Sequence, residues 1–332
     1  MKKFNFYLKM FLSIVLFSQP LYIYSQTSGY KIIDKIEIGG TGGWDYLALY
    51  EPVHQLFVSH GSEVDVVNTV SNTVAGKIEG MKGVHGIAFA PEFGKGFITD
   101  GRDNTVVVFD LKTLKVIEKI KTTGEGPDAI AYDPFTKRIF SLNGHGGNST
   151  AIDAKTDKVE GTVQLDGGPE FCVSDFNGHM FVNIEDKNEV EEFDPKTLKV
   201  INKWSLAPLE TPTGLAIDLK NNRLFIGCRS QFLAVFDIKS GKITDKFPID
   251  KGVDACRYDA ETHLIFCSTK DGSISVVKQE APDKYTLLDK IMTLPRAKTM
   301  ELDPVTHRLY TSTMIEGKDN QNIFGVLVLD KN

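Results

Sequence analysis

The chain has 332 residues, of which 41% are hydrophobic and 25% are charged, with 29 glycines and 13 prolines. These values lie near the average for globular proteins and exclude a disordered, collagen-like or coiled-coil chain. A chain this long buries enough surface to fold without disulfides or metals, and all-β folds of this size often form one domain. We therefore expect residues 26–332 to form a single domain.

Residues 1–25 have the features of a signal peptide. Three lysines precede a short apolar run at residues 10–17, and Ser25 is a small residue before a plausible cleavage at Gln26. The apolar run is too short to span a bilayer. We expect a periplasmic or secreted protein without membrane insertion.

The charge of the mature chain argues against nucleic acid as a partner. Without the signal peptide and its three lysines, 44 acidic residues face 35 basic residues, a net charge of −9. A field of that sign repels phosphate backbones and anionic lipid surfaces, and the chain has no cluster of lysines and arginines to offset it.

The motif content excludes several cofactors and enzyme classes. The four cysteines form no CxxC or CxxCH pair, which excludes zinc ribbons, thioredoxin-like sites and c-type haem. The glycines at residues 39–43 lack the Lys-Ser/Thr of a phosphate-binding loop, so no nucleotide cofactor is expected. The chain also has no GxSxG, HExxH or EF-hand motif. Cys256 and Cys267 either face each other across a hairpin or are buried free thiols.

Seven repeats of about 42 residues run from Tyr30 to the C-terminus. The register comes from an aromatic residue in the second strand-like run of each repeat, and successive aromatics lie 40, 43, 41, 44, 41 and 44 residues apart. The seven aromatic residues are Phe57, Phe97, Phe140, Phe181, Phe225, Phe266 and Tyr310.

Each repeat has the pattern of four short strands. The strand-like runs are rich in Val, Ile and Phe, and the connections between them carry Pro, Gly, Asp and Asn. No long stretch shows helical periodicity. An Asp-x-x-Thr/Ser turn recurs before the fourth strand, and its polar side chains can bond local backbone N–H groups. The third repeat predicts strands at 128–132, 138–143, 149–152 and 159–165.

A period near 42 with four strands per repeat is typical of a β-propeller. The last repeat supplies only three strands, at 298–302, 308–313 and 324–329, and the strand-like run at 30–38 stands before the first repeat. Pairing these two ends completes the last blade and removes an open sheet edge. We predict an all-β, seven-bladed propeller closed in this way.

Four motifs make the chain resemble the YVTN-type and YncE-like exported β-propellers. The resemblance extends over the whole mature chain and implies a seven-bladed propeller outside the cytoplasm. The motifs are Gly83-Val84-His85-Gly86, Pro127 to Pro134 (PDAIAYDP), Asn183-Ile184-Glu185-Asp186 and Pro212 to Ala216 (PTGLA).

Seven equivalent polar positions open the first strands of the seven repeats. First strands of propeller blades are innermost, so these side chains should form a ring around one mouth of the axial channel. Either they cap strand ends, or they form a polar binding site. Crowded carboxylates would raise one another's pKa values unless a cation or Lys298 offsets them. The seven residues are Asp45, His85, Asp128, Glu170, Thr213, Asp254 and Lys298.

A second ring of polar residues is expected beside the first, where the second strands end. His60, Asn143, Asn183 and Glu185 are its candidate binding residues. Turn chemistry is the alternative explanation, and it suffices for Asn143 followed by Gly144.

Part of the first ring has the chemistry of a metal site. His85, Asp128 and Glu170 come from consecutive repeats, and Asp45 comes from the repeat before them. One imidazole with several carboxylates suits one divalent cation with open coordination positions. No other cofactor is indicated.

Two functions fit these features. The first is a monomeric, non-catalytic scaffold that holds a small polar ligand, an ion or a loop of a protein partner at the channel mouth. The alternative is a hydrolase, lyase or isomerase that uses His85 or a carboxylate as general base, with or without a metal.

Overall fold

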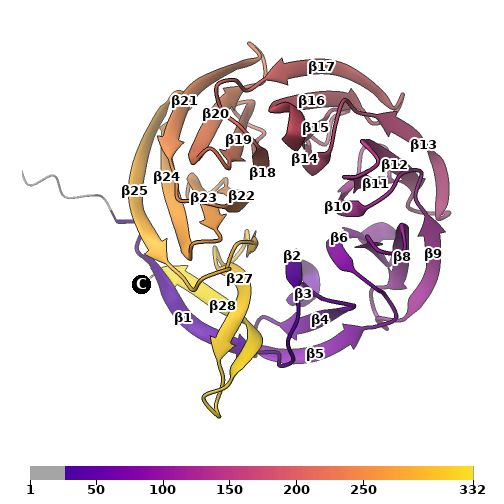
Figure 1. The fold of residues 1–332 in the computed structure, drawn as a ribbon, viewed down its shortest axis with the longest axis vertical. Helices are drawn as coiled ribbons and strands as arrows, with labels where there is room; N and C mark the ends of the chain where they lie inside the picture. The colour runs from indigo at the N-terminus through magenta and orange to yellow at the C-terminus, as the bar shows by residue number, and fades with distance from the viewer. Residues whose placement is uncertain (1–26, 332) are drawn as a thin grey trace, which may run out of the picture.

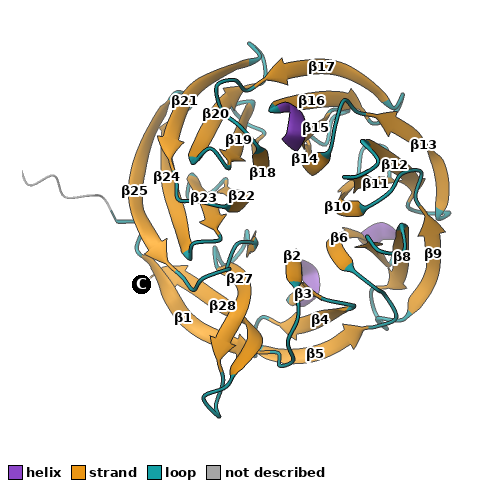
Figure 2. Ribbon diagram, in the orientation of Figure 1, coloured by secondary structure: helices purple, strands orange, loops and turns teal. Residues whose placement is uncertain are grey.

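The structure is a computed structural model that describes residues 27–331, so the predicted signal peptide at residues 1–25 lies outside the described residues. Its strands form seven four-stranded antiparallel sheets that stand as blades around a central axis (Figure 1). Strands follow one another outward from the axis in each of the first six blades (Figure 2). The predicted all-β, seven-bladed propeller is confirmed.

The first three blades contain twelve strands in chain order. Blade 1 comprises β2 (Trp44–Tyr50), β3 (Gln55–His60), β4 (Glu63–Asn68) and β5 (Thr73–Ile78). Blade 2 comprises β6 (Val84–Ala90), β7 (Lys95–Asp100), β8 (Thr105–Asp110) and β9 (Val116–Lys121). Blade 3 comprises β10 (Pro127–Asp133), β11 (Arg138–Asn143), β12 (Asn148–Asp153) and β13 (Lys158–Gln164).

The next three blades repeat this order. Blade 4 comprises β14 (Pro169–Ser174), β15 (Met180–Ile184), β16 (Glu189–Asp194) and β17 (Lys199–Ser205). Blade 5 comprises β18 (Pro212–Asp218), β19 (Arg223–Cys228), β20 (Phe232–Asp237) and β21 (Lys242–Pro248). Blade 6 comprises β22 (Val253–Asp259), β23 (Leu264–Thr269), β24 (Ser273–Ala281) and β25 (Lys284–Met292).

Blade 7 is built from both ends of the chain, and three short 3-10 helices complete the secondary structure. Blade 7 comprises β26 (Met300–Leu302), β27 (Leu309–Glu316), β28 (Asn322–Lys331) and β1 (Tyr30–Glu37). The helices are η1 (Glu51–Val53), η2 (Pro91–Phe93) and η3 (Glu185–Lys187). Within residues 27–331, no helix is long and apolar enough to cross a membrane.

The predicted strand ranges agree with the observed strands within a few residues. In blade 3 the second strand has its predicted range, and each of the other three strands differs by one residue at both ends. The exception is Lys298, which precedes β26 instead of opening it. A turn formed by Ala297 N–H donating to the Leu294 carbonyl delays the start of that strand.

The core lies between blades, where the faces of adjacent sheets meet. The seven register aromatics are all buried; for example, the ring of Phe57 packs 5.0 Å from that of Phe89 in the next blade. Burying each such side chain stabilises the fold by roughly 1.5–3 kcal/mol. The outermost strands of blades 1 to 3 are exposed over most of their length and each buries one residue near its end, so the period-42 pattern marks the interfaces between blades.

The recurring Asp-x-x-Thr/Ser turns bond their own backbone as predicted. Asp110 Oδ1 accepts hydrogen bonds from the N–H groups of Lys112 and Thr113 and from the Thr113 hydroxyl. Asp153 makes the same set of contacts in blade 3. These bonds satisfy turn N–H groups without requiring glycine.

The two ends of the chain close the ring. β1 pairs antiparallel with β28, from Tyr30 opposite Lys331 to Glu37 opposite Gly325. Figure 1 shows the indigo strand β1 lying beside the yellow strands of the C-terminus. The predicted closure is confirmed, and it leaves no unpaired strand of blade 7 where the chain ends.

Cys256 and Cys267 face each other, and both are free thiols. They are directly opposite on β22 and β23, with their Sγ atoms 2.7 Å apart. All four cysteines are buried, and burial raises the pKa values of the Cys172 and Cys228 thiols to about 12. Deeply buried thiols of this kind are poor nucleophiles.

Deleting residues 26–38 should open the ring. The deletion removes β1 and exposes the ten-residue edge of β28, together with apolar groups that Ile36 and Tyr30 cover. An exposed hydrophobic edge promotes intermolecular pairing. We expect aggregation or loss of cooperative unfolding, measured by light scattering and thermal melting.

A circular permutant provides the matched control. Tyr30 lies opposite Lys331, so a short turn can join the end of β28 directly to β1, with new termini placed between Glu37 and Trp44. The permutant should fold and melt cooperatively. A deletion protein that melts like the parent would show that closure does not hold the ring together.

Candidate functional site at the axial mouth

A backbone bulge aims the first-ring side chains at the channel. In each of the first six blades, the pairing of the inner strand with its neighbour shifts register at the ring position, for example between Trp44 and Leu47 and between Val84 and Ile87. A bulge bends the strand and redirects side chains. The ring residues therefore turn toward the axis while the rest of each inner strand packs in the core.

Hydrogen bonds from other blades hold the ring backbone in place. Thr299 donates its hydroxyl to the Asp45 carbonyl (2.6 Å), and Ser268 donates to the Lys298 carbonyl (2.5 Å). The other ring carbonyls bonded in this way are those of His85, Asp128, Glu170 and Thr213. Each bond contributes roughly 1 kcal/mol and fixes one ring residue against the preceding blade or across the channel.

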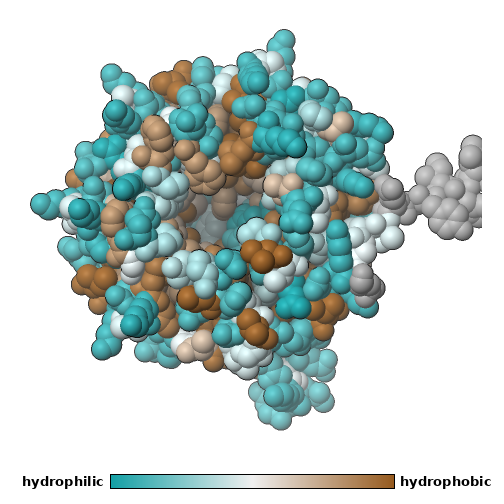
Figure 3. Space-filling model, turned by 180° about the vertical axis from the view of Figure 1, so that it is seen from behind, coloured by the Kyte–Doolittle hydropathy of each residue, from teal (hydrophilic) through white to brown (hydrophobic). Residues whose placement is uncertain are grey.

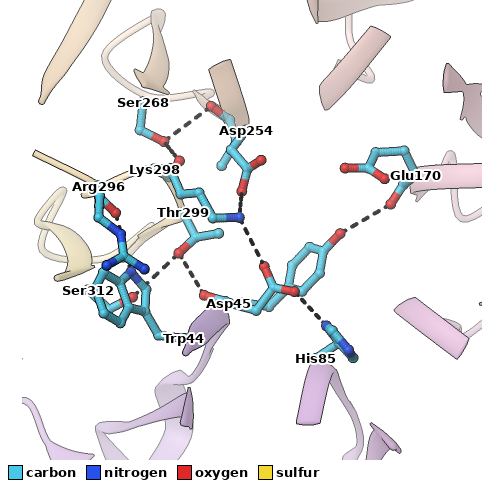
Figure 4. Close-up of polar contacts among 12 residues, drawn as sticks. Trp44, Asp45, His85, Glu170, Asp254, Ser268, Arg296, Lys298, Thr299 and Ser312 are labelled. Atoms are coloured by element: carbon cyan, nitrogen blue, oxygen red, sulfur yellow. Dashed lines mark hydrogen bonds and ion pairs between the residues drawn. The ribbon is translucent and has the colours of Figure 1, made fainter. Parts of the chain in front are cut away.

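Charged side chains from four blades form a connected group at the mouth (Figure 4). Lys298 Nζ lies 2.6 Å from Asp254 Oδ2 and 3.5 Å from Asp45 Oδ1. On the other side of Asp45, His85 Nδ1 lies 2.7 Å from Oδ2. Asp45 thus links the last blade to the second.

Arg229 extends this group to the opposite side of the mouth. Its Nη1 bonds Glu185 Oε1 at 2.5 Å, and its Nη2 lies 3.6 Å from Asp254 Oδ1 and 3.8 Å from Glu170 Oε1. One guanidinium therefore serves three carboxylates, which leaves the group with an excess of negative charge.

Burial in the narrow mouth raises the pKa values of its carboxylates. Burial and the charge of Asp45 raise the pKa of Asp128 to about 7, although His85 and Lys298 oppose the shift. Burial and the charge of Asp128 raise the pKa of Glu170 well above its usual range. Burial also raises the pKa of Asp254, against the opposing effect of Lys298.

The pKa values of the basic groups are raised as well, but here neighbouring carboxylates are the cause and burial opposes the shift. Burial alone would lower the pKa of His85, but its hydrogen bond to Asp45 and the charges of Asp128 and Asp45 raise that pKa overall. For Lys298, the attraction of Asp254 and Asp45 outweighs burial and raises its pKa. Both cations are therefore favoured in the folded protein.

Larger side chains cross the channel next to the ring. Tyr46 donates its hydroxyl to the Glu170 carbonyl (3.2 Å) and packs its ring 5.8 Å from that of Phe171. Arg257 lies over Phe171 and pairs with Glu301 at 3.1 Å. These side chains leave a cavity of only about 100 Å³ and form a floor to the mouth.

Two larger cavities lie at the mouth itself. One, of about 480 Å³, is lined by His85, Asp128, Glu170 and Glu185 together with Arg102. The other, of about 680 Å³, is lined by a more basic set: Trp44, Arg229, Asp254, Lys270, Arg296 and Lys298. Figure 3 shows the molecule from the side opposite to that of Figure 1. On this side the centre of the ring is hollow, and hydrophilic residues cover most of the periphery.

Six of the seven predicted first-ring residues come together at the mouth. Thr213 does not contribute its side chain, because that residue is 1% exposed and its hydroxyl donates to the Thr211 carbonyl. For Thr213 the capping interpretation therefore fits better than the binding interpretation.

Of the four residues predicted for the second ring, one lines the mouth and three do not. Glu185 lines the mouth and pairs with Arg229. His60 bonds Asp65, Asn143 bonds Asn148 and Thr150 within its own blade, and Asn183 donates to the carbonyls of Thr213 and Gly214 in blade 5. His60 and Asn143 thus stabilise their own blades, and Asn183 joins blade 4 to blade 5. None of these three side chains lines the two cavities of the mouth.

Several residues of the mouth escaped the sequence analysis. Arg229 and Lys270 lie four residues after their register aromatics, the same offset as Glu185, so the repeat register carried a signal for them. Arg296 lies two residues before Lys298, and nothing in the repeat register marks it as a residue of the mouth. Its guanidinium lies 4.3 Å from the Trp44 ring centroid, a contact that no sequence spacing indicates.

Three of the four predicted metal ligands converge. Donor atoms of Asp45, His85 and Asp128 lie within 4.8 Å of one another, whereas Glu170 lies outside this group and faces Arg229. One imidazole and two carboxylates fit a divalent cation with open positions. Lys298 beside Asp45 would compete with such a cation.

Comparison with known proteins finds distant relatives of the chain. No protein-family model matches the chain. The uncharacterized YncE proteins of Salmonella typhi and Salmonella typhimurium are each 24% identical over 193 residues, which is 55% of this chain and 53% of theirs. The chain therefore matches about half the length of these curated relatives. The chain is a β-propeller that is similar to these YncE proteins over that part.

A solved structure agrees with the propeller fold, and one further protein is similar in sequence. Hydrazine synthase of Kuenenia stuttgartiensis superposes with a TM-score of 0.73 at 13% identity, over 85% of this chain and 94% of that one. At that identity the likeness concerns the fold alone. A probable U3 small nucleolar RNA-associated protein 18 of Schizosaccharomyces pombe is 22% identical over 157 residues, 46% of this chain and 30% of that protein.

Asp128→Asn should stabilise the propeller at neutral pH. The folded protein binds the Asp128 proton more tightly than the unfolded chain does, so ionisation costs stability as the pH rises from about 4 to the folded pKa of about 7. The side chain is 31% exposed, so we expect a gain of only about 1–2 kcal/mol at pH 8. The gain should shrink toward zero at pH 4 in thermal melts.

Asp110→Asn is a control of opposite sign. Hydrogen bonds from Thr113 lower the pKa of Asp110, so its ionised form stabilises the fold at neutral pH and this contribution is lost in acid. Asp110→Asn should therefore destabilise at pH 8. If Asp128→Asn behaves like Asp110→Asn, Asp128 is a capping residue and not part of a strained site.

Proposed function

We propose that this YncE-like propeller is a non-catalytic binding scaffold whose axial mouth holds a small polar ligand with a cationic group. The observation that carries the proposal is the excess of carboxylates over cations in the inner part of the mouth, inside the basic residues of its rim. Arg229 and Lys298, with His85 when it is protonated, balance only part of this charge. The carboxylates are Asp45, Asp128, Glu170, Glu185 and Asp254.

Asp128 offers the most specific contact for such a ligand. Its Oδ1 is buried, lies 3.4 Å from His85 Nδ1, and has no hydrogen-bond partner among residues 27–331. The two observations agree, because the Nδ1 proton of His85 is already donated to Asp45 at 2.7 Å. A cationic or hydrogen-bond-donating ligand would satisfy this oxygen.

The outer part of the mouth supports a second, anionic group on the ligand. Arg102, Lys270 and Arg296 are exposed at the rim of the two cavities, outside the more buried carboxylates. Cavities of about 480 and 680 Å³ have the size of small-molecule sites, which favours a small ligand over a loop of a protein partner.

Catalysis and RNA binding have less support. The raised pKa values of Asp128 and His85 would suit a general base, but binding sites show such shifts as well. The RNA-associated name of one distant relative suggests a nucleic-acid partner, whereas the carboxylate-rich mouth would repel phosphate groups.

We also propose that the scaffold acts outside the cytoplasm, as the features of residues 1–25 suggest. Expression of the full chain in a bacterial host should yield mature protein in the periplasm or medium, with an N-terminus at or near Gln26. Mass spectrometry of the intact protein measures this. Recovery of full-length chain from the cytoplasm alone would contradict export.

Ligand binding should raise the melting temperature of the purified mature chain. A ligand that binds only the folded state stabilises it by about 2.7 kcal/mol at a hundredfold excess over Kd. We would screen Mg²⁺, Mn²⁺ and Zn²⁺ in one arm and ethanolamine, choline and free amino acids in the other. The arm that raises the melting temperature identifies the cationic group as a metal or an ammonium.

Variants of the mouth then test the location. Asp128→Asn and Glu170→Gln keep the side-chain shape and remove charge, so they should abolish the response, whereas Asp110→Asn should retain it. A response that survives both mouth variants would place the ligand elsewhere. No response in either arm would reject a cationic ligand.

A further inference from the structure

A second group of carboxylates lies on blade 4, outside the axial mouth. It consists of Asp166, in the loop between β13 and β14, with Glu189 and Glu191 on β16. One oxygen from each residue lies within 4.8 Å of the others. Glu189 and Glu191 are two residues apart on one strand, so their side chains share a face of the sheet.

Glu191 is the central residue of this group. Its side chain is 0% exposed, and its Oε1 accepts a hydrogen bond from the Asp166 N–H (3.1 Å) and lies 3.4 Å from Lys203 Nζ. Its Oε2 is buried and has no hydrogen-bond partner in the described part of the chain. An ionised oxygen left in this state is costly, which indicates a missing partner.

The local charges leave room for a divalent cation. Lys203 is the cation paired with this group, and it contacts Asp166 and Glu191. The neighbouring Lys187 pairs instead with Asp186. Three ionised carboxylates and one ammonium carry a net charge of −2.

Blade 1 shows how the same positions look when the chain supplies its own partner. His60 lies opposite Glu63 just as Ile184 lies opposite Glu189, and Asp65 occupies the place of Glu191. His60 Nδ1 lies 3.0 Å from Asp65 Oδ2, and its Nε2 lies 3.3 Å from the Thr41 carbonyl. The imidazole thus fills the space beside the buried carboxylate.

Blade 4 has the opposite arrangement at both equivalent positions. Ile184 cannot donate a hydrogen bond where His60 does, and Asp166 adds a carboxylate where blade 1 has Thr41. The donor is absent and an additional anionic ligand is present. This difference points to an external cation.

We propose that Asp166, Glu189 and Glu191 bind one calcium ion. Calcium takes six to eight oxygen ligands in flexible geometry, including water, whereas magnesium requires near-ideal octahedral geometry. Asp166 is 51% exposed, so water can complete the coordination, and Lys203, 40% exposed, can turn into solvent. The ion would tie β16 to the loop at residues 165–168, which leads directly to Glu170 at the mouth.

Calorimetry on the mature chain, treated with EDTA and dialysed, tests the site with CaCl₂ as the probe. We expect one calcium ion per chain and a higher melting temperature. Glu191→Gln and Asp166→Asn should each lower the calcium affinity by roughly tenfold or more, because both remove ligand charge. Asp166 is exposed, so its variant tests the site even if Glu191→Gln disturbs folding.

Two controls separate this site from the rest of the protein. Glu63→Gln changes the equivalent position of blade 1 and should leave calcium binding unchanged. Asp128→Asn changes the axial mouth and should also leave it unchanged. Absence of calcium binding to the parent protein, unaltered binding in both Glu191→Gln and Asp166→Asn, or loss of binding in Asp128→Asn would each overturn the proposal.

Discussion

Closure of the ring is the constraint on which the axial site depends. β1 completes blade 7 by pairing with β28, and this holds the last blade against the first. Lys298 and Asp45, 253 residues apart in the chain, thereby come within 3.5 Å of each other. The Thr299 hydroxyl bonds the Asp45 carbonyl across the same junction. Without closure, Lys298 could not contact both Asp254 of blade 6 and Asp45 of blade 1.

The mouth concentrates like charges that the rest of the fold must hold in place. Bulges in five inner strands place ionisable side chains at the mouth, and hydrogen bonds from other blades hold the backbone of the ring residues. Burial, with repulsion between the carboxylates as a smaller cause, raises the pKa values of Asp128, Glu170 and Asp254. Binding sites commonly store such unfavourable energy, because a ligand of opposite charge relieves it. The interfaces between blades supply the stability that permits it.

The sequence predicted the fold well because each repeat places one buried aromatic at a nearly constant step, and that step sets the number of blades. It also predicted which backbone positions ring the mouth. The sequence could not predict which partners the side chains at these positions contact. Thr213 bonds its own loop, and His60 and Asn143 bond partners inside their blades. Arg229 reaches three carboxylates because its side chain is long, and an offset along a strand carries no information about such reach.

Repetition makes the molecule its own reference, because the same backbone position occurs in every blade. The buried Asp65 of blade 1 bonds His60, whereas in blade 4, where Glu191 takes the place of Asp65, Ile184 takes the place of that histidine. The backbones are equivalent, so the difference must lie in what the side chains contact. The loop carrying Asp166 continues through Pro169 into Glu170, and Gly168 in that loop donates its N–H to Asp186. An ion that fixed this loop would also fix the approach to Glu170, so blade 4 is where a peripheral site and the axial mouth share one segment of backbone.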